Sequence, residues 1–240
     1  MAPKLVIIAV LGLTGSAVCI GAVAAIGGGN FSDGFDGLFD GGPRCRQIDG
    51  ATAISRTLDW DGSDHAGLAV RATANYAPGN DDKVHATGDP QVLAHLRVRD
   101  GTVEMDCHGW RDRDADVNIT LPGRAFGKFI LTGTGKMNLD RLDQANLKVQ
   151  VAGVATIKAN GKVDDLRIEM AGVSKADFSQ VTGRKANVKM AGVSKADIAP
   201  SDEANIEIAG PSEVTLHSNP KKLETEIAGL GRIHKVAPGS

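Results

Sequence analysis

The chain contains the octapeptide Met170-Ala171-Gly172-Val173-Ser174-Lys175-Ala176-Asp177 and repeats it, residue for residue, at Met190 to Asp197. The glycine of this segment recurs over a longer stretch than the octapeptide itself. It stands at Gly133, Gly153, Gly172, Gly192, Gly210 and Gly229, with spacings of 20, 19, 20, 18 and 19 residues. A fixed period of this kind indicates a repeat architecture, in which each copy is one unit stacked on its neighbours.

Apolar and polar residues alternate on both sides of each glycine. Four and two places before it stand pairs such as Val149 and Val151 or Ile206 and Ile208, with a polar residue between them in five of the six copies. A second alternating segment begins four places after it, as at Ile157, and frays at Lys235 in the last copy. Period-two alternation is typical of strands with one buried face. The pattern predicts an all-β fold, a single-stranded β-solenoid with about 19 residues per coil and an apolar interior.

The N-terminus predicts export. Leu5 to Ile26 is an apolar run preceded by Lys4, and it is long enough to cross a hydrocarbon core of roughly 30 Å as a helix. Residues 1–26 are therefore a transmembrane anchor or a signal peptide, because Ala22-Val23-Ala24 also resembles a cleavage site. Cys19 offers a third possibility, lipidation. All three interpretations place the rest of the chain outside the cytoplasm.

Three further segments follow the apolar run. Residues 27–44 are rich in Gly and Asp and are predicted to be a linker; calcium binding by their Asp-Gly pairs is the alternative, but the spacing of a calcium loop is absent. Residues 45–109 are predicted to form the N-terminal β part of the solenoid domain, and residues 110–236 its repeat coils. Within residues 45–109 we expect a strand at Val92 to Val98, a turn at Gly88-Asp89-Pro90 and no helix.

Cys45 and Cys107 fall on the exported side, where an oxidising compartment would allow a disulfide. Two unpaired thiols are the alternative. A zinc site would need ligands from distant parts of the chain, since Cys107-His108 is the only close pairing of the two residue types.

Composition and motifs exclude several function classes. The net charge of −2, with both signs evenly mixed, provides no broad basic field for nucleic acid. The six histidines show no metal-binding spacing, and no enzyme motif is complete, so we expect no catalytic residues, cofactor or metal. Asp177 with Asp197, and Lys175 with Lys195, should form short ladders on neighbouring coils. Such a row can bind a cation or a carbohydrate, or it can be a solvated face with balanced charges.

The repeat region resembles a known bacterial family, the putative auto-transporter adhesin domain called the head GIN domain. The resemblance lies in Val117 to Pro122, which alternates and ends in Leu-Pro, in Phe129 to Met137, and in the Ala-Gly copies that follow, and it extends over Cys45 to Val236. It implies a right-handed parallel β-helix-like fold in an envelope-exposed protein. It implies adhesion rather than catalysis.

The sequence thus predicts a non-enzymatic cell-envelope protein, membrane-anchored with its domain in the periplasm or at the cell surface. Its partner would be a protein or a surface glycan, with the membrane contacted through the N-terminal segment and nucleic acid excluded. The alternatives are a structural scaffold that self-associates into a homo-oligomer and, third, a β-helix polysaccharide lyase or hydrolase.

Overall fold

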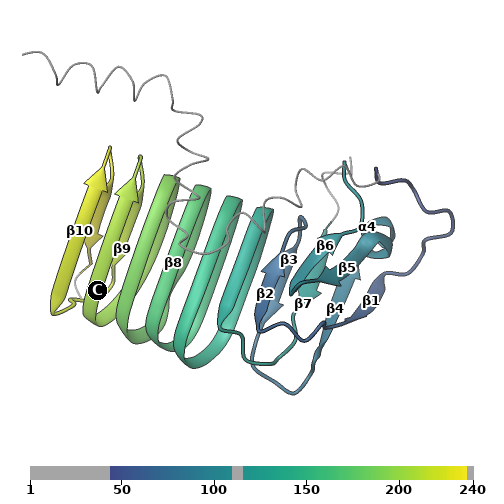
Figure 1. Ribbon diagram of the computed structural model, residues 1–240, viewed down its shortest axis with the longest axis horizontal. Coiled ribbons are helices and arrows are strands. Elements are labelled where there is room, and N and C mark those ends of the chain that lie inside the picture. Colours follow the sequence, from purple (N-terminus) through teal and green to yellow (C-terminus); the bar gives the residue numbers. More distant parts are fainter. Residues whose placement is uncertain (1–43, 110–115, 237–240) are drawn as a thin grey trace, which may run out of the picture. The chain divides into compact units, whose positions relative to one another are not determined.

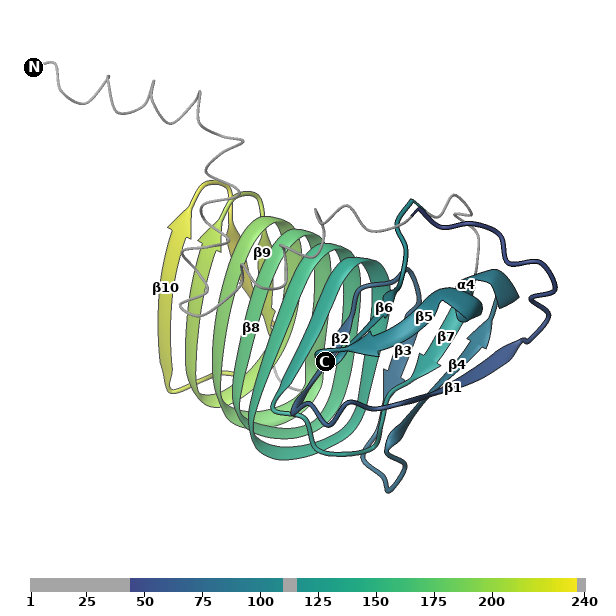
Figure 2. The same cartoon turned by 45° about the vertical axis from the view of Figure 1, so that its right-hand side comes forward.

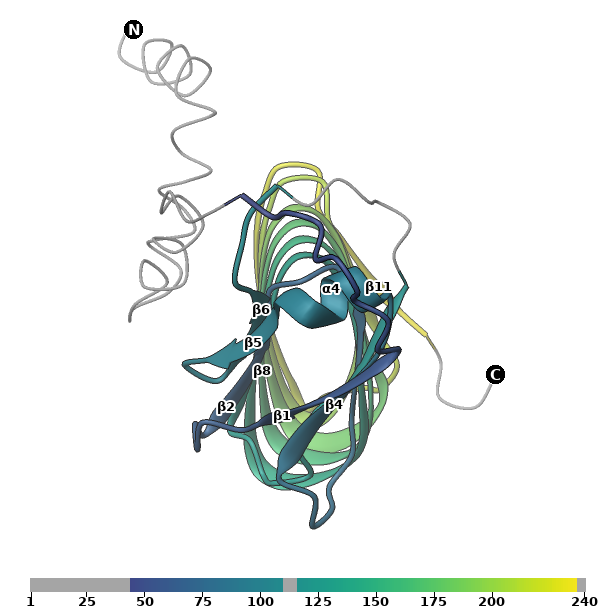
Figure 3. The ribbon, with the colours of Figure 1, turned by 90° about the vertical axis from the view of Figure 1, so that its right-hand side faces the viewer.

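The structure, a computed structural model, describes residues 44–109 and 116–236. These residues form a single 11-stranded sheet and one short helix, so the all-β prediction is confirmed. The elements are β1 (Ser55–Asp59), β2 (His65–Leu68), β3 (Thr73–Tyr76), β4 (Lys83–Gly88), α4 (Pro90–His95), β5 (Leu96–Arg99), β6 (Thr102–Met105), β7 (Val117–Thr120), β8 (Lys128–Ala209), β9 (Glu213–Leu216), β10 (Lys222–Ala228) and β11 (Arg232–Lys235). Viewed end-on, the sheet curls into a nearly closed, flattened tube around the core (Figure 3).

Most of the tube is built by β8, whose 82 residues wind round it in successive passes that lie side by side (Figures 1 and 2). The last passes are completed by β9, β10 and β11. Their parallel pairing places Ile227 beside Ile208 and Val214 beside Ala196. These partners are 19 and 18 residues apart, so the register deduced from the glycine period is confirmed for these copies.

The predicted fold class, a single-stranded, right-handed parallel β-helix-like solenoid, is wrong, because the sheet forms a nearly closed barrel with mixed strand directions. The sheet runs in the order β1-β4-β7-β3-β8-β2-β6-β5, so neighbours in space are often not neighbours in sequence. β2 and β3 lie against β8 although β6 and β7 come between them in the chain, and three pairings, β1–β4, β4–β7 and β5–β6, are antiparallel. Alternation tells which face of a strand is buried, but it does not tell which strand lies beside it. The prediction failed because alternation carries no information about which strands are neighbours.

The strand predicted at Val92 to Val98 is also wrong over its first half, which is the helix α4. Asp89 caps this helix, because its side chain accepts hydrogen bonds from the backbone N–H groups of Gln91 and Val92, and Pro90 occupies the first turn. An aspartate followed by proline is a common helix start. Val92 and Leu93 lie within the helix, and their side chains are buried.

The predicted segment at 1–26 and nearly all of the predicted linker lie outside the described residues. In the part of the chain that the structure describes, α4 is far too short to cross a bilayer, and no other helix is present.

The core begins with an aromatic cluster. Phe126 and Phe129 contact Tyr76 with ring centroids 5.7 and 4.9 Å apart, and Trp60 packs edge-on against Phe126. Fully buried aliphatic residues extend the core from this cluster through the successive passes of the tube. All core residues of the described part of the chain belong to the compact unit Gly42–Ser240, and we use this unit as the fragment for the measurements below.

We expect Ile168→Ala to lower the free energy of unfolding of the Gly42–Ser240 fragment by about 2–5 kcal/mol, because Ile168 is fully buried between two passes. Lys162→Ala is the control, since Lys162 is exposed, and it should change the value by less than about 0.5 kcal/mol. Urea titrations followed by circular dichroism measure both. Equal values for the two variants would contradict the assigned core.

Candidate binding surface

The repeated glycines form one edge of the tube, where the chain turns from one side to the other. Gly153, Gly172 and Gly192 have φ values of 125°, 107° and 113°, a region that side chains disfavour. A Cβ atom on Gly172 would lie 2.6 Å from the carbonyl oxygen of Gly153, and one on Gly192 would lie 2.5 Å from that of Gly172. Successive corners therefore stack backbone against backbone.

Buried serines fasten these corners together. The hydroxyl of Ser174 donates to the carbonyl of Gly153 over 3.1 Å, that of Ser194 to Gly172 over 3.2 Å, and that of Ser212 to Gly192 over 2.8 Å. Each bond satisfies a carbonyl of the preceding pass. The residues on either side of each serine thus hold fixed positions on the outer surface.

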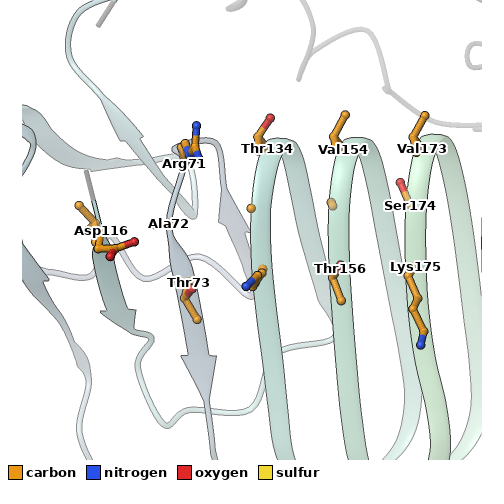
Figure 4. Close-up of a pocket in the computed structure, with 14 residues that line it drawn as sticks. Arg71, Ala72, Thr73, Asp116, Thr134, Val154, Thr156, Val173, Ser174 and Lys175 are labelled. Carbon is orange, nitrogen blue, oxygen red and sulfur yellow. The ribbon is translucent and has the colours of Figure 1, made fainter. Parts of the chain in front are cut away.

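The residue directly after each glycine projects into solvent. Val154, Val173 and Val193 are 58%, 55% and 55% exposed, and Leu230 is 81% exposed. Figure 4 shows the side chains of Thr134, Val154 and Val173 side by side at the tops of adjacent passes. We name this row the corner ridge; it comprises Thr134, Val154, Val173, Val193, Pro211 and Leu230. A contiguous apolar row on a surface commonly marks a contact site.

A second row runs parallel to the corner ridge, formed by the third residue after each glycine. We name it the basic row; its members are Lys136, Thr156, Lys175, Lys195, Glu213 and Arg232. Lys195 pairs with Glu213 at 3.0 Å, and this hydrogen bond raises the pKa of Lys195 and lowers that of Glu213. Among the described residues, Lys136 and Lys175 form no ion pair.

Two shallow grooves lie along these rows. The larger has a volume of about 540 Å³ and is lined by Arg71, Ala72, Thr73, Asp116, Val117, Thr134, Gly135, Lys136, Val154, Ala155, Thr156, Val173, Ser174 and Lys175. The smaller, of about 340 Å³, is lined by Ser174, Val193, Ser194, Lys195, Pro211, Ser212, Glu213, Leu230 and Arg232. Ser174 borders both, so the grooves form one continuous track along the edge. Three cations and one carboxylate border the larger groove, which favours an anionic or hydroxyl-rich ligand.

The aspartates predicted to form a ladder have separate partners. Asp197 is buried and lies 3.2 Å from Nε2 of His217. Asp177 accepts hydrogen bonds from the hydroxyl and the backbone N–H of Ser179. Burial acts to raise the pKa of Asp177, but the bonds from Ser179 together with the nearby charges of Lys175 and Lys158 lower it below its ordinary value. Of the lysines, Lys195 is paired with Glu213, so opposite charges offset part of the row.

Cys45 and Cys107 are joined in a disulfide, with their Cα atoms 4.8 Å apart. His95, Asp106 and Cys107 lie close enough together to suggest a metal site, and no other such group occurs in residues 44–109 and 116–236. The sulfur of Cys107 is already bonded, however. His95 lies 2.8 Å from Asp106 through Nδ1 and 2.9 Å from the carbonyl oxygen of Arg46 through Nε2, so its ring nitrogens are engaged as well. The three residues are a structural cluster at the disulfide.

Sequence reasoning missed the corner ridge. The signal was present, because three of the six glycines are followed directly by valine. The glycines set the register of the repeat, but the direction of the next side chain depends on the corner geometry. At a corner it points outward.

Ser179→Ala should raise the pKa of Asp177, because burial of the carboxyl then acts without the hydroxyl bond. A lowered folded-state pKa stabilises the fold above the unfolded pKa, and that contribution disappears as the pH falls through the folded value. The variant should therefore lose more stability at about pH 7 than at about pH 2. Carbon-13 NMR of the carboxyl and urea titrations at both pH values test this. Ser218→Ala, which removes a bond to the carbonyl of Pro200, should cost the same at both.

Solved structures with a similar fold include a putative adhesin from Bacteroides fragilis, which is 15% identical over 76% of this chain and 96% of its own, with a TM-score of 0.60. A putative lipid binding protein from Parabacteroides distasonis is 14% identical over 80% of this chain and 100% of its own, with a TM-score of 0.43. A putative adhesin from Parabacteroides merdae is 14% identical over 80% of this chain and 98% of its own, with a TM-score of 0.40. No protein of curated function matches the chain.

Residues 100–220, half of the chain, match the family described as putative auto-transporter adhesin, head GIN domain. The matched range holds β6, β7, nearly all the repeated copies and most of both grooves. It agrees with the resemblance that the sequence suggested. The chain belongs to the putative auto-transporter adhesin, head GIN domain family.

Proposed function

We propose that this chain is a non-enzymatic protein of the bacterial cell envelope that binds a protein or glycan partner along the corner ridge and the two grooves. Membership of an adhesin family supports the envelope setting and the binding role. The apolar run at residues 1–26 supports an exported, membrane-anchored placement, with the sheet in the periplasm or at the cell surface.

One observation carries the proposal: three cations without ion pairs border the same groove as the exposed valines. Arg71, Lys136 and Lys175 are exposed and, among the described residues, have no carboxylate within ion-pairing distance. The protein as a whole is nearly neutral, with a net charge of −2, so these three cations form a local basic patch. Such a local field attracts and orients an anionic partner.

The exposed valines supply the apolar part of the proposed contact with a partner. Val154 and Val173 stand more than half exposed beside the cations. Covering apolar surface contributes about 25 cal/mol per Å². A partner that lies across the edge can therefore meet apolar and basic rows together, and a rigid surface loses little conformational freedom when it binds.

Glycan cleavage has weaker support. Hydrolysis of a glycosidic bond uses two carboxyl groups on opposite sides of the bond. Among the described residues, Asp116 is the one acidic residue that lines the larger groove. Glu213 is the one that lines the smaller groove, and it is paired with Lys195. The described track offers contacts for a chain of sugars rather than a pair of reacting groups.

The proposal predicts that the Gly42–Ser240 fragment binds at least one member of an array of neutral and anionic glycans and immobilised extracellular proteins. The double variant Lys136→Glu, Lys175→Glu should then weaken that binding by at least about tenfold, or about 1.4 kcal/mol. Val154→Ser with Val173→Ser should also weaken it. Surface plasmon resonance on the captured partner measures the dissociation constants.

The matched control is Lys158→Glu with Lys162→Glu, which makes the same change of net charge at exposed lysines outside both grooves. It should leave the dissociation constant within about twofold, about 0.4 kcal/mol. The proposal is rejected if the fragment binds nothing on the array, or if the control pair weakens binding as much as the groove pair does.

A further inference from the structure

The two strands of the last pass each have one unoccupied edge within the described residues. β10 pairs only with β8, and β11 pairs only with β9. The opposite end of the tube differs, because α4 contacts β1 and β4 there and buries Val92 and Leu93 (Figure 3). Unpaired edges expose backbone N–H and C=O groups that readily pair with another strand.

Apolar side chains are also incompletely covered at this end. Ile227 is in register with Ile208, yet Ile208 is 2% exposed and Ile227 is 42% exposed. Leu223 and Ile233 continue the core outward and are only partly buried. The side chains that would be core in any inner pass are here an open surface.

Charge differs between the two strands. β10 carries Glu224 and Glu226, whereas β11 carries Arg232 and His234, with Lys235 at its end. Lys222 bonds Glu203 and Glu224, so the acidic character of β10 resides mainly in Glu226. The pass therefore has one acidic and one basic edge.

β10 and β11 run in opposite directions. The chain reverses at the corner between β10 and β11, and the two strands lie on facing sides of the tube (Figures 2 and 3). A two-fold axis parallel to the strands would bring each β10 beside the β11 of a second copy, antiparallel to it. With the two corners level, Ile227 faces the partner's Ile233, and Glu226 faces the partner's His234, two residues along the strand from Arg232.

We propose that a second copy of this chain occupies these edges, in a two-fold dimer joined end to end through β10 and β11. Apolar side chains then meet at the centre, acidic and basic side chains meet outside them, and the backbone groups of both edges pair. The other two-fold arrangement, which pairs β10 with itself about Thr225, places Glu224 beside Glu226 twice and is disfavoured by repulsion. The dimer edge adjoins the proposed binding surface and shares Arg232 with the smaller groove, but the inference does not depend on the proposed function.

Sedimentation equilibrium of the Gly42–Ser240 fragment, from about 1 to about 300 µM, tests the proposal, because a dissociation constant in that range gives a measurable change of mass. Wild type should approach the dimer mass. Ile227→Lys should weaken dimerisation at least about tenfold. Ile54→Lys is the matched control: Ile54 is 72% exposed and lies outside β10 and β11, so dimerisation should stay unchanged.

A charge exchange guards against effects of misfolding. Glu226→Arg alone should weaken the dimer, and adding His234→Glu should restore it, because both residues are exposed, His234 lies beside the uncharged Thr215 in its own chain, and the facing charges are only reversed. Circular dichroism confirms that each variant is folded. The proposal is overturned if the protein is a monomer at every concentration. It is also overturned if neither Ile227→Lys nor Glu226→Arg weakens the dimer.

Discussion

The structure depends on the direct contact between backbones at the repeated corners. Because the carbonyl oxygen of Gly153 occupies the space where a side chain on Gly172 would begin, each pass can lie on the last only if the corner residue is glycine. This contact fixes the register between successive passes, and the register determines which side chains reach the outer surface. It places the next residue outward, the buried serine after that against the preceding carbonyl, and the third residue in the basic row. The surface available for binding is thus a direct product of the packing.

The segments before and after each corner glycine differ in how their charges are paired. This difference favours the side after the glycine as the proposed binding side. Before the glycine, Glu169 bonds both Lys148 and Gln150, and Lys189 bonds Glu207. Those charges neutralise one another and contribute little to attraction at a distance. After the glycine, Lys136 and Lys175 remain without ion pairs among the described residues. The proposed binding edge and a flank of balanced charges therefore occupy adjacent parts of the same sheet.

The sequence predicted what is local and missed what is not. The glycine period gave the strands, the buried face of each and the register between the later copies, because steric limits at glycine and the period-two alternation act within about 20 residues. It could not show that β2 and β3 lie against β8 with β6 and β7 beyond them, since those neighbours are set by long-range packing. The helix after Asp89 and the corner ridge have local sequence signals, an Asp-Pro helix start and a valine after three of the glycines. The cations of the larger groove were visible only one by one, because Arg71 and Lys136 meet through the pairing of β3 with β8.

Replacement of a corner glycine tests the account most directly. Gly172→Ala combines a disfavoured φ with a Cβ atom inside contact distance of Gly153, and it should lower the free energy of unfolding by at least about 2 kcal/mol. Gly127→Ala meets no atom within 4 Å and should be within about 0.5 kcal/mol of wild type. Urea denaturation of the Gly42–Ser240 fragment measures both. A Gly172→Ala protein as stable as wild type would show that successive passes do not meet at their corners, and the ridge, the basic row and the grooves would lose their structural basis.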